Sequence, residues 1–140
     1  MIPIGKARVA RKGQHVSIIS WSNGMTYSLK AADELAKEGI EAEVIDLRSL
    51  RPLDTDTVIE SVKKTNRIVC CEEGWRFFGV GAEIAAAVTE HAFDYLDAPP
   101  MRVAQKDVPL PYAPTLIEAY LPNPARVIKA VKEVMYLQKA

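Results

Sequence analysis

The residues best placed to carry chemistry are the neighbouring carboxylates Glu72 and Glu73, which directly follow an apolar, β-branched run and precede a glycine. At the carboxyl edge of an open α/β sheet, where ligands usually bind, two carboxylates could act as a general acid and a general base. Adjacent side chains in a strand point to opposite faces, however, so we do not expect this pair to act together. The large aromatic residues that follow, Trp75, Phe77 and Phe78, favour a subunit contact over catalysis.

Two glycine-containing turns could hold a nucleotide or an anion. The turn at residues 20–25 stands where a dinucleotide-binding fold carries Gly-x-Gly-x-x-Gly, but it contains a single glycine, Gly24. Gly79 and Gly81 begin an expected helix and could present free N–H groups to an anion. Close packing of the helix start is the commoner reason for such glycines, so we expect ordinary turns at both places.

No metal ligand set or nucleophilic triad is visible in the sequence. His15 and His91 stand alone, without a cysteine or a second histidine at metal-binding spacing. Cys70 and Cys71 lie in an apolar run, where burial would leave their thiols inert. No Gly-x-Ser-x-Gly motif is present. We therefore predict no catalytic, cofactor-binding or metal-binding residue.

Short apolar runs alternate with segments of helical periodicity. Asp54 and Asn123 can cap helix starts, Pro124 suits the first helical position, and Gly39 suits a left-handed C-cap. The alternation indicates an α/β fold with a mostly parallel sheet covered by helices on both faces. Seven of the nine prolines lie between residues 99 and 124, so we expect an ordered surface loop there with one short helical turn. The expected strands are residues 7–11 (an edge strand), 16–21, 42–47, 67–71 and 101–104, and the expected helices begin near residues 25, 54, 79 and 123.

Composition excludes several classes of protein. The chain has 140 residues, of which 49% are hydrophobic and 26% charged, as suits one globular domain with a core. Its 18 basic and 18 acidic residues cancel, which argues against a nucleic-acid binder. Two adjacent cysteines cannot form a disulfide framework, so a reducing compartment is expected. We expect no membrane span, because the uncharged stretch at residues 13–29 is rich in polar side chains, and no signal peptide.

Seven segments, taken in order, match one family. Together they resemble the C-terminal domain of the β subunit of the pyruvate dehydrogenase decarboxylase component, a thiamine-diphosphate enzyme of the transketolase superfamily. The resemblance implies a three-layer α/β/α domain whose five-stranded sheet is mostly parallel, with an antiparallel first strand. It also implies that residues 1–140 form a single domain of a longer β subunit whose N-terminal, thiamine-binding half is absent. The segments are residues 4–7, 43–54, 61–67, 72–75, 79–84, 95–99 and 106–113.

The resemblance further implies an activity that belongs to a larger enzyme. In the family, two α and two β subunits form a heterotetramer that decarboxylates pyruvate and reductively acetylates the lipoyl group of dihydrolipoyl acetyltransferase. Thiamine diphosphate and Mg²⁺ bind between the α subunit and the N-terminal domain of the β subunit, so we expect the isolated chain to be inactive. Such an enzyme is cytoplasmic in bacteria and lies in the mitochondrial matrix in eukaryotes.

The implied role of this domain is assembly and partner docking. In the family, an acidic residue of a Leu-Asp-Ala-Pro motif contacts the basic subunit-binding domain of the acetyltransferase, and Asp97 occupies that position here. An exposed carboxylate can steer a basic partner, although the alternative remains that Asp97 only caps its turn. Glu73, Trp75, Phe77 and Phe78 are expected to contact other subunits or partners.

Departures from the family pattern and two rival interpretations remain. The chain has Arg76-Phe77-Phe78 after Trp75 where the family has proline and a small polar residue, and Ala104-Gln105 in place of Thr-Gly. Residues 138–140 extend past the usual end, so the family's contact through the terminal carboxylate is not carried over. The rivals are a branched-chain 2-oxoacid or acetoin dehydrogenase β subunit, and a self-standing flavodoxin-like module that binds a nucleotide or an anion. The missing glycine-rich loop counts against the module.

Overall fold

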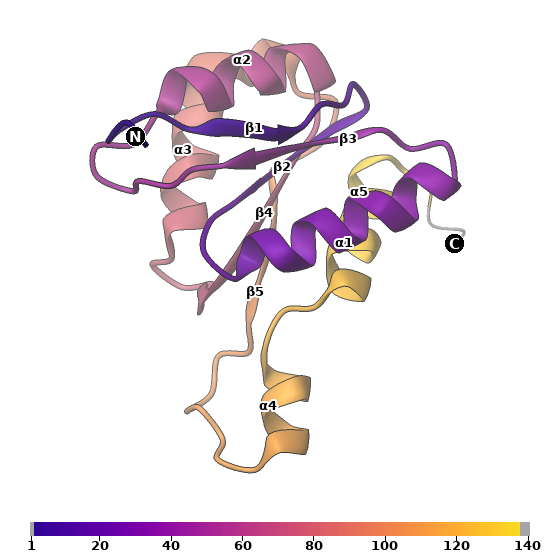
Figure 1. Cartoon of the computed structure of the whole chain (residues 1–140). Helices are drawn as coiled ribbons and strands as arrows, with labels where there is room; N and C mark the ends of the chain where they lie inside the picture. The colour runs from indigo at the N-terminus through magenta and orange to yellow at the C-terminus, as the bar shows by residue number, and fades with distance from the viewer. Residues whose placement is uncertain (1, 138–140) are drawn as a thin grey trace.

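The computed structural model describes residues 2–137, and in it strands alternate with helices as the sequence predicts (Figure 1). Residues 138–140, which we expect to extend past the usual end of the family, lie outside the described residues. The elements are β1 (Arg8–Arg11), β2 (Val16–Ser20), α1 (Gly24–Lys37), β3 (Ala42–Asp46), α2 (Thr55–Thr65), β4 (Ile68–Trp75), α3 (Val80–Ala92), the 3₁₀ turn η1 (Phe93–Tyr95), β5 (Met101–Gln105), α4 (Pro114–Tyr120) and α5 (Pro124–Val134).

The five strands form one mixed sheet in the order β1-β3-β2-β4-β5. Strands β2, β3, β4 and β5 run parallel, whereas β1 pairs antiparallel with β3, with Arg8 opposite Asp46. The predicted edge strand and the mixed, mostly parallel sheet are therefore confirmed. Because β1 runs against the others, its first residue lies at the same edge of the sheet as the last residues of β3, β4 and β5; we call this the carboxyl edge.

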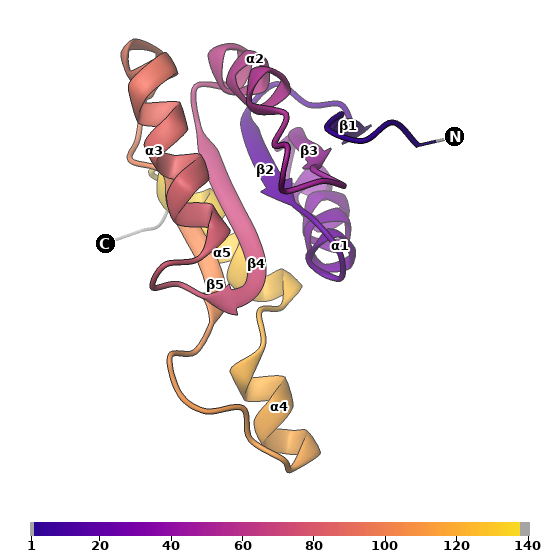
Figure 2. The same cartoon turned by 90° about the vertical axis from the view of Figure 1, so that its left-hand side faces the viewer.

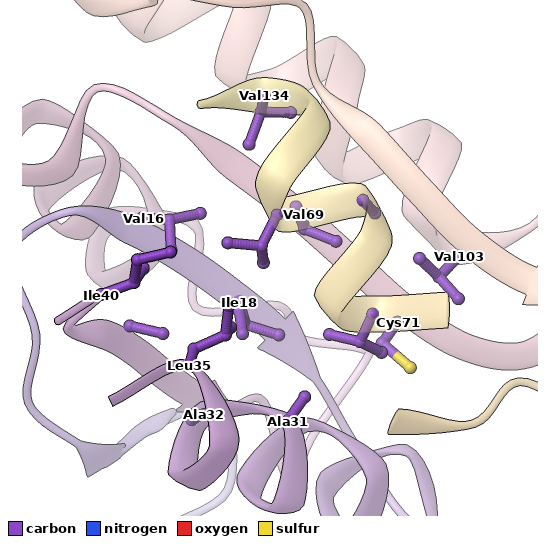
Figure 3. Packing of buried hydrophobic residues seen from close by; sticks show 14 of the residues in the cluster. Val16, Ile18, Ala31, Ala32, Leu35, Ile40, Val69, Cys71, Val103 and Val134 are labelled. Carbon is purple, nitrogen blue, oxygen red and sulfur yellow. The ribbon is translucent and has the colours of Figure 1, made fainter. Parts of the chain in front are cut away.

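Helices cover both faces of the sheet, which makes the three predicted layers (Figures 1 and 2). Helices α1 and α5 pack on one face, where Ile18 and Cys71 contribute to the core drawn in Figure 3. Helices α2 and α3 pack on the other face, against Ile19 and Cys70. Side chains along β2 and β4 point alternately to the two faces of the sheet and so pack against both helical layers. Full burial of one aliphatic side chain stabilises the fold by about 1.5–3 kcal/mol. Burial raises the pKa of both thiols, as expected of inert cysteines.

The three capping residues that the sequence singles out act as predicted. Asp54 Oδ1 accepts a hydrogen bond from the Thr57 amide at the start of α2 (3.3 Å), and Asn123 Oδ1 accepts one from the Arg126 amide at the start of α5 (3.0 Å). Gly39 follows α1 with a φ of +79°, in the left-handed region that a residue without a Cβ adopts most easily.

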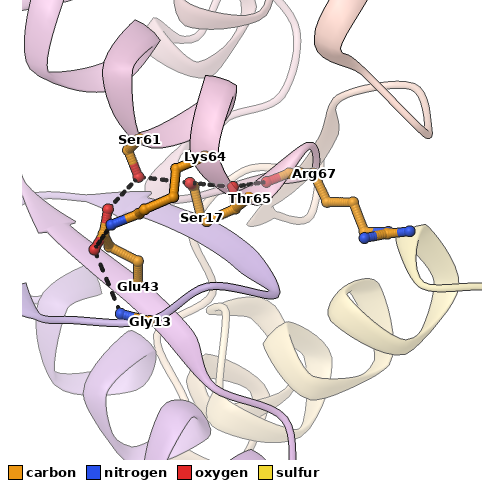
Figure 4. A network of polar contacts seen from close by, with 7 residues as sticks. All are labelled: Gly13, Ser17, Glu43, Ser61, Lys64, Thr65 and Arg67. Carbon is orange, nitrogen blue, oxygen red and sulfur yellow. Dashed lines mark hydrogen bonds and ion pairs between the residues drawn. The ribbon is translucent and has the colours of Figure 1, made fainter.

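A buried polar network ties α2 to the sheet on the far side from the carboxyl edge (Figure 4). The Glu43 carboxylate accepts a hydrogen bond from Ser61 Oγ (2.7 Å) and forms an ion pair with Lys64. Ser17 Oγ lies 2.6 Å from Ser61 Oγ and 2.7 Å from Thr65 Oγ1. Since each hydroxyl and the carboxylate has a partner, the burial of these groups is compensated and the network fixes the position of α2.

The structure extends one strand beyond its predicted end and shows how the proline-rich region is folded. Strand β4 continues to Trp75 rather than ending at Cys71, because β5 lies alongside it and pairs Gln105 with Trp75. The proline-rich region contains the expected short helix, α4, within residues 106–121, which we call the arm. The arm projects away from the rest of the domain, and the Lys106 amide closes its base by donating to the carbonyl oxygen of Tyr120 (3.1 Å) (Figures 1 and 2). No helix within residues 2–137 is long and apolar enough to cross a bilayer.

Candidate interaction surfaces

At the carboxyl edge, the side chain of Glu72 lies against the N-terminus of α3. Its side chain is buried, and Oε1 accepts a hydrogen bond from the Gly81 amide (3.0 Å). Burial raises the pKa of this carboxyl above its ordinary range, although hydrogen bonds from the Gly81 and Val80 amides and the charge of Arg102 oppose that shift. A Cβ on Gly81 would lie 2.7 Å from Glu72 Oε1, and one on Gly79 would lie 2.4 Å from the Trp75 carbonyl oxygen. Both glycines are thus required by close packing, as expected, and the protein's own carboxylate takes the place of an external anion.

Glu73 points to the opposite face and binds the start of α1. Its Oε1 accepts hydrogen bonds from the Tyr27 hydroxyl (2.7 Å) and from Asn23 Nδ2 (2.8 Å). Burial and the neighbouring Glu73 carboxylate raise the pKa of Tyr27 to about 12. Glu72 and Glu73 therefore do not form an acid–base pair, as the alternation along a strand predicts.

Trp75 is held at the base of the arm by Gln105. With the Gln105 amide oriented to satisfy its neighbours, its oxygen accepts hydrogen bonds from Trp75 Nε1 (3.0 Å) and from the Tyr120 hydroxyl (2.7 Å). The ring of Trp75 remains half-exposed at 51%, whereas Tyr120 is buried. The tryptophan is thereby fixed in orientation while about half of its surface stays exposed.

Phe77 and Phe78 form an exposed aromatic pair next to Trp75. Their ring centroids lie 4.5 Å apart in an edge-to-face arrangement, and the two side chains are 73% and 91% exposed. The backbone of Phe78 has a φ of +55°, which is unfavourable for a bulky residue. Arg102 Nη1 donates to the carbonyl oxygen of Arg76 (2.8 Å) and holds the loop that carries the pair. The aromatic run that the sequence assigns to a subunit contact is therefore exposed in this chain.

Asp97 lies at the other end of β4, beyond η1. Its Oδ2 forms an ion pair with Arg67 Nη2 (2.8 Å), and its carboxylate remains half-exposed at 51%. The Asp97 amide donates to the carbonyl oxygen of Asn66 (2.9 Å), and the Tyr136 hydroxyl donates to the Asp97 carbonyl oxygen (3.2 Å). The backbone of the turn is thus held by Asn66 and Tyr136, and the carboxylate is held by Arg67 with one side toward solvent.

An apolar groove of about 310 Å³ adjoins Asp97. Exposed Phe93 and the two prolines that precede β5 contribute to it, and Asp97 is one of its lining residues. A carboxylate beside an apolar groove suits a partner that presents a basic side chain next to an apolar one. The groove is lined by Thr89, Phe93, Leu96, Asp97, Ala98, Pro99 and Pro100.

Comparison with known families assigns the fold. The family model described as the C-terminal domain of transketolase matches residues 5–127. This chain belongs to the transketolase C-terminal domain family. A solved structure titled as an inactive β4 tetramer of a split-gene transketolase agrees with it at a TM-score of 0.83 and 30% identity, over 96% of this chain and 43% of that one.

Curated relatives of this transketolase C-terminal domain carry a more specific name. The chain is 55% identical over 136 residues to the pyruvate dehydrogenase E1 component subunit β of Rhizobium meliloti, which covers 97% of this chain and 30% of that protein. It is 49% identical over 139 residues to the mitochondrial subunit of the same name from Dictyostelium discoideum, covering 99% of this chain and 39% of that protein. The resemblance inferred from the motifs is confirmed, and the chain spans less than half of the length of these relatives.

The transketolase C-terminal domain separates the predicted partner-binding residues into two surfaces. Glu73, Trp75, Phe77 and Phe78 lie at or just beyond the carboxyl end of β4, whereas Asp97 lies beside Arg67, which immediately precedes β4. Strand β4, which is irregular between Cys71 and Trp75, lies between the two places. The sequence alone did not indicate that Arg67 anchors Asp97 or that Gln105 anchors Trp75. For Gln105 a signal was present, because Ala104-Gln105 replaces the Thr-Gly of the family.

Residues 2–137 of this domain do not fit thiamine diphosphate or Mg²⁺. In that part of the chain no three His, Cys, Asp or Glu side chains gather closely enough to bind a metal ion. The glycine turn before α3, the place most suited to a diphosphate, is filled by the Glu72 carboxylate. The described residues therefore show no ligand set for the cofactor.

Proposed function

We propose that this chain is the assembly and partner-docking domain of the β subunit of a thiamine-diphosphate-dependent pyruvate dehydrogenase (acetyl-transferring). The observation that carries the proposal is the 49–55% identity to subunits of that name over almost the whole chain. In the complete enzyme, with an α subunit and a second β subunit, pyruvate is decarboxylated and the lipoyl group of dihydrolipoyl acetyltransferase is acetylated. Thiamine diphosphate and Mg²⁺ belong to other parts of that enzyme.

The surface around Asp97 is the proposed docking site for the acetyltransferase. Arg67 holds one oxygen of the carboxylate at 2.8 Å, so the side chain is pre-oriented before a partner arrives. Its half-exposed carboxylate can attract a basic side chain, and the apolar groove beside it can take up the stem of that side chain or an apolar neighbour. These features support docking of the basic subunit-binding domain of the acetyltransferase at this place.

Contacts with other parts of the enzyme are assigned to the opposite end of β4. Trp75 is fixed by Gln105, and Phe77 and Phe78 present aromatic rings to solvent. Aromatic residues dominate the energetics of protein interfaces because they bury a large area at a small cost in conformational entropy. These exposed aromatic rings support a role of this surface in assembly.

Binding and activity of the full-length enzyme test this proposal. Coexpression of the full-length β subunit with its α subunit is expected to yield pyruvate decarboxylation, with weaker activity on branched-chain 2-oxo acids and acetoin. Asp97→Asn is expected to weaken binding of the acetyltransferase subunit-binding domain at low salt by about tenfold, equivalent to about 1.4 kcal/mol. Asp107→Asn, an exposed carboxylate on the arm, is the matched control and should leave the dissociation constant unchanged.

Each part of the proposal can fail separately. Preferential turnover of a branched-chain substrate or of acetoin would contradict the assignment to pyruvate. An unchanged dissociation constant for Asp97→Asn would remove Asp97 from the docking site while leaving the assignment to pyruvate intact. Isothermal titration calorimetry at two salt concentrations measures the binding, because an electrostatic contribution at an exposed carboxylate decreases as salt increases.

A further inference from the structure

We infer that Arg67 makes the surface around Asp97 selective for a lysine of its partner over an arginine. The inference rests on the proposed function in one respect, namely that a basic partner docks at Asp97. It adds which basic side chain that partner presents and which residue of this chain decides it. The Asp97 carboxylate and the apolar groove beside it form this surface, which we call the Asp97 surface.

Arg67 contacts one of the two oxygens of the Asp97 carboxylate. Its Nη2 lies 2.8 Å from Oδ2, and within residues 2–137 the other oxygen, Oδ1, has no ion pair or hydrogen bond. About half of the Asp97 side chain is exposed to solvent. A partner that approaches from solvent therefore meets a carboxylate with one oxygen already paired and one oxygen free.

The position of Arg67 is fixed by the buried polar network that ties α2 to the sheet (Figure 4). The carbonyl oxygen of Arg67 accepts hydrogen bonds from the Ser17 amide (2.8 Å) and from Thr65 Oγ1 (3.1 Å). Its side chain extends away from the network, and Nε is buried without a hydrogen-bond partner in the described part of the chain. A partner that displaced the guanidinium from Asp97 would leave a mostly buried charge unpaired, which is costly. Arg67 therefore stays in place when the partner binds.

The turn that carries Asp97 is held by the same end of α2. The Asp97 amide donates to the carbonyl oxygen of Asn66 (2.9 Å), and Asn66 Nδ2 donates to the carbonyl oxygen of Tyr95 (2.8 Å). With the Arg67 ion pair, three contacts join the helix end to this turn. The carboxylate and the guanidinium thus share one support, and the carboxylate does not turn freely to offer both oxygens to a partner.

An ammonium and a guanidinium differ in what they require of a carboxylate. A guanidinium binds most strongly as a fork, with two parallel N–H groups on two oxygens, and Arg67 leaves only one oxygen free. A lysine ammonium is a compact charge that needs one oxygen, and its four-carbon stem can lie along an apolar groove. The groove beside Asp97, with Phe93 and Leu96 among its lining residues, provides such a surface. The presence of Arg67 therefore penalises a partner arginine more than a partner lysine.

Binding of the acetyltransferase subunit-binding domain to the full-length β subunit, assembled with its α subunit, tests the inference. Asp97→Asn is first combined with single substitutions of the basic residues of that domain, and the position at which the two effects are not additive is the one that contacts Asp97. Domains with lysine or arginine at that position are then compared by isothermal titration calorimetry. The lysine form should bind about three- to fivefold more tightly, within the range expected for one exposed charge contact.

Arg67→Met is expected to remove the preference for lysine, because both oxygens of Asp97 then become available to a guanidinium. Arg11→Met is the matched control: Arg11 pairs with Asp33 at 2.6 Å, and its side chain is 28% exposed against 26% for Arg67. This control should keep the preference. If Arg67→Met does not assemble with the α subunit, Arg67→Gln, which keeps a polar side chain, serves in its place.

Two results would overturn the inference alone. One is equal or tighter binding of the arginine form to the unmodified enzyme, which requires no variant of Arg67. The other is a preference for lysine that persists after the substitution of Arg67. Both leave docking at Asp97 intact. If Asp97→Asn leaves the binding of every form unchanged, the proposed docking site is wrong and the inference is overturned with it, so the two failures are distinguishable.

Discussion

Glu72 and Glu73 are neighbours in β4, yet their carboxylates bind different helices on opposite faces of the sheet. Glu72 Oε1 accepts from the Gly81 amide of α3 at 3.0 Å, and Glu73 Oε1 accepts from the Tyr27 hydroxyl of α1 at 2.7 Å. The pair therefore joins the end of one strand to both helical layers. This arrangement stabilises the carboxyl edge, from which the aromatic residues project.

Glu72 is expected to make the protein less stable as the pH rises. Burial raises its pKa in the folded state above the unfolded value of about 4.3, so in that pH window the folded state holds more protons than the unfolded state. The free energy of unfolding must then decrease as the pH rises from about 4.3 through the folded pKa. Glu72→Gln should remove this slope, as measured by urea denaturation between pH 4 and pH 8. Glu90→Gln, on the exposed side of α3, should keep it.

Gly81→Ala is expected to destabilise the domain through a clash with Glu72. The new Cβ would lie 2.7 Å from Glu72 Oε1, and overpacking of this kind costs about 1–3 kcal/mol. In a Glu72→Ala background the oxygen is absent, and the remaining neighbours of the Cβ lie at 3.3 Å or more. The cost of Gly81→Ala should therefore fall by about 1 kcal/mol or more in the double variant. Additive effects, within about 0.5 kcal/mol, would show that the two residues are not coupled.

Asp54→Ala is expected to lower stability at neutral pH and to matter less in acid. Burial alone would raise the pKa of Asp54, but hydrogen bonds from the Ala7 amide and from Thr57 outweigh it and hold that pKa below its ordinary value. The stabilisation is then present above about pH 3.9 and is lost as the pH falls through the folded pKa. At pH 7 the loss should be about 2 kcal/mol. Asn123→Ala removes the equivalent cap of α5, and its cost should not depend on pH in the same range.

The isolated chain is expected to show no pyruvate decarboxylation, with or without added thiamine diphosphate and Mg²⁺. The reason is that its described residues offer no ligand set for the cofactor. A dye-linked decarboxylation assay, with the full-length enzyme as the positive control, measures this. Turnover by the purified 140-residue chain above the background of a mock purification would refute the expectation.

The isolated chain is also expected to self-associate through its exposed aromatic residues. Phe78 is 91% exposed beside Phe77, and contiguous apolar surface of this kind promotes association. Sedimentation velocity should show a mass above 15.5 kDa that increases with concentration. Phe78→Ser should reduce the association, whereas Phe93→Ser, at the opposite edge, should not. Equal effects of the two substitutions would assign the association to hydrophobicity in general.

Much of the fold follows from local patterns in the sequence. The caps at Asp54 and Asn123 and the left-handed residue Gly39 could be predicted because capping depends on groups within a few residues of each other. The opposite orientations of Glu72 and Glu73 follow equally from the alternation of side chains along a strand. These relationships require no knowledge of distant contacts.

Tertiary contacts decided the rest. Strand β4 extends to Trp75 because β5, far along the chain, pairs with it, and Glu72 fills the N-terminus of α3 because the chain turns back on itself there. No local pattern specifies where the arm projects or that Arg67 holds Asp97 from a distant position in the sequence. The sequence by itself determined which residues form strands, helices and caps, since those depend on short-range periodicity and hydrogen bonding. Only the tertiary structure decided that Asp97 and the aromatic residues lie on two separate surfaces, because that separation depends on how the strands and helices are arranged in space.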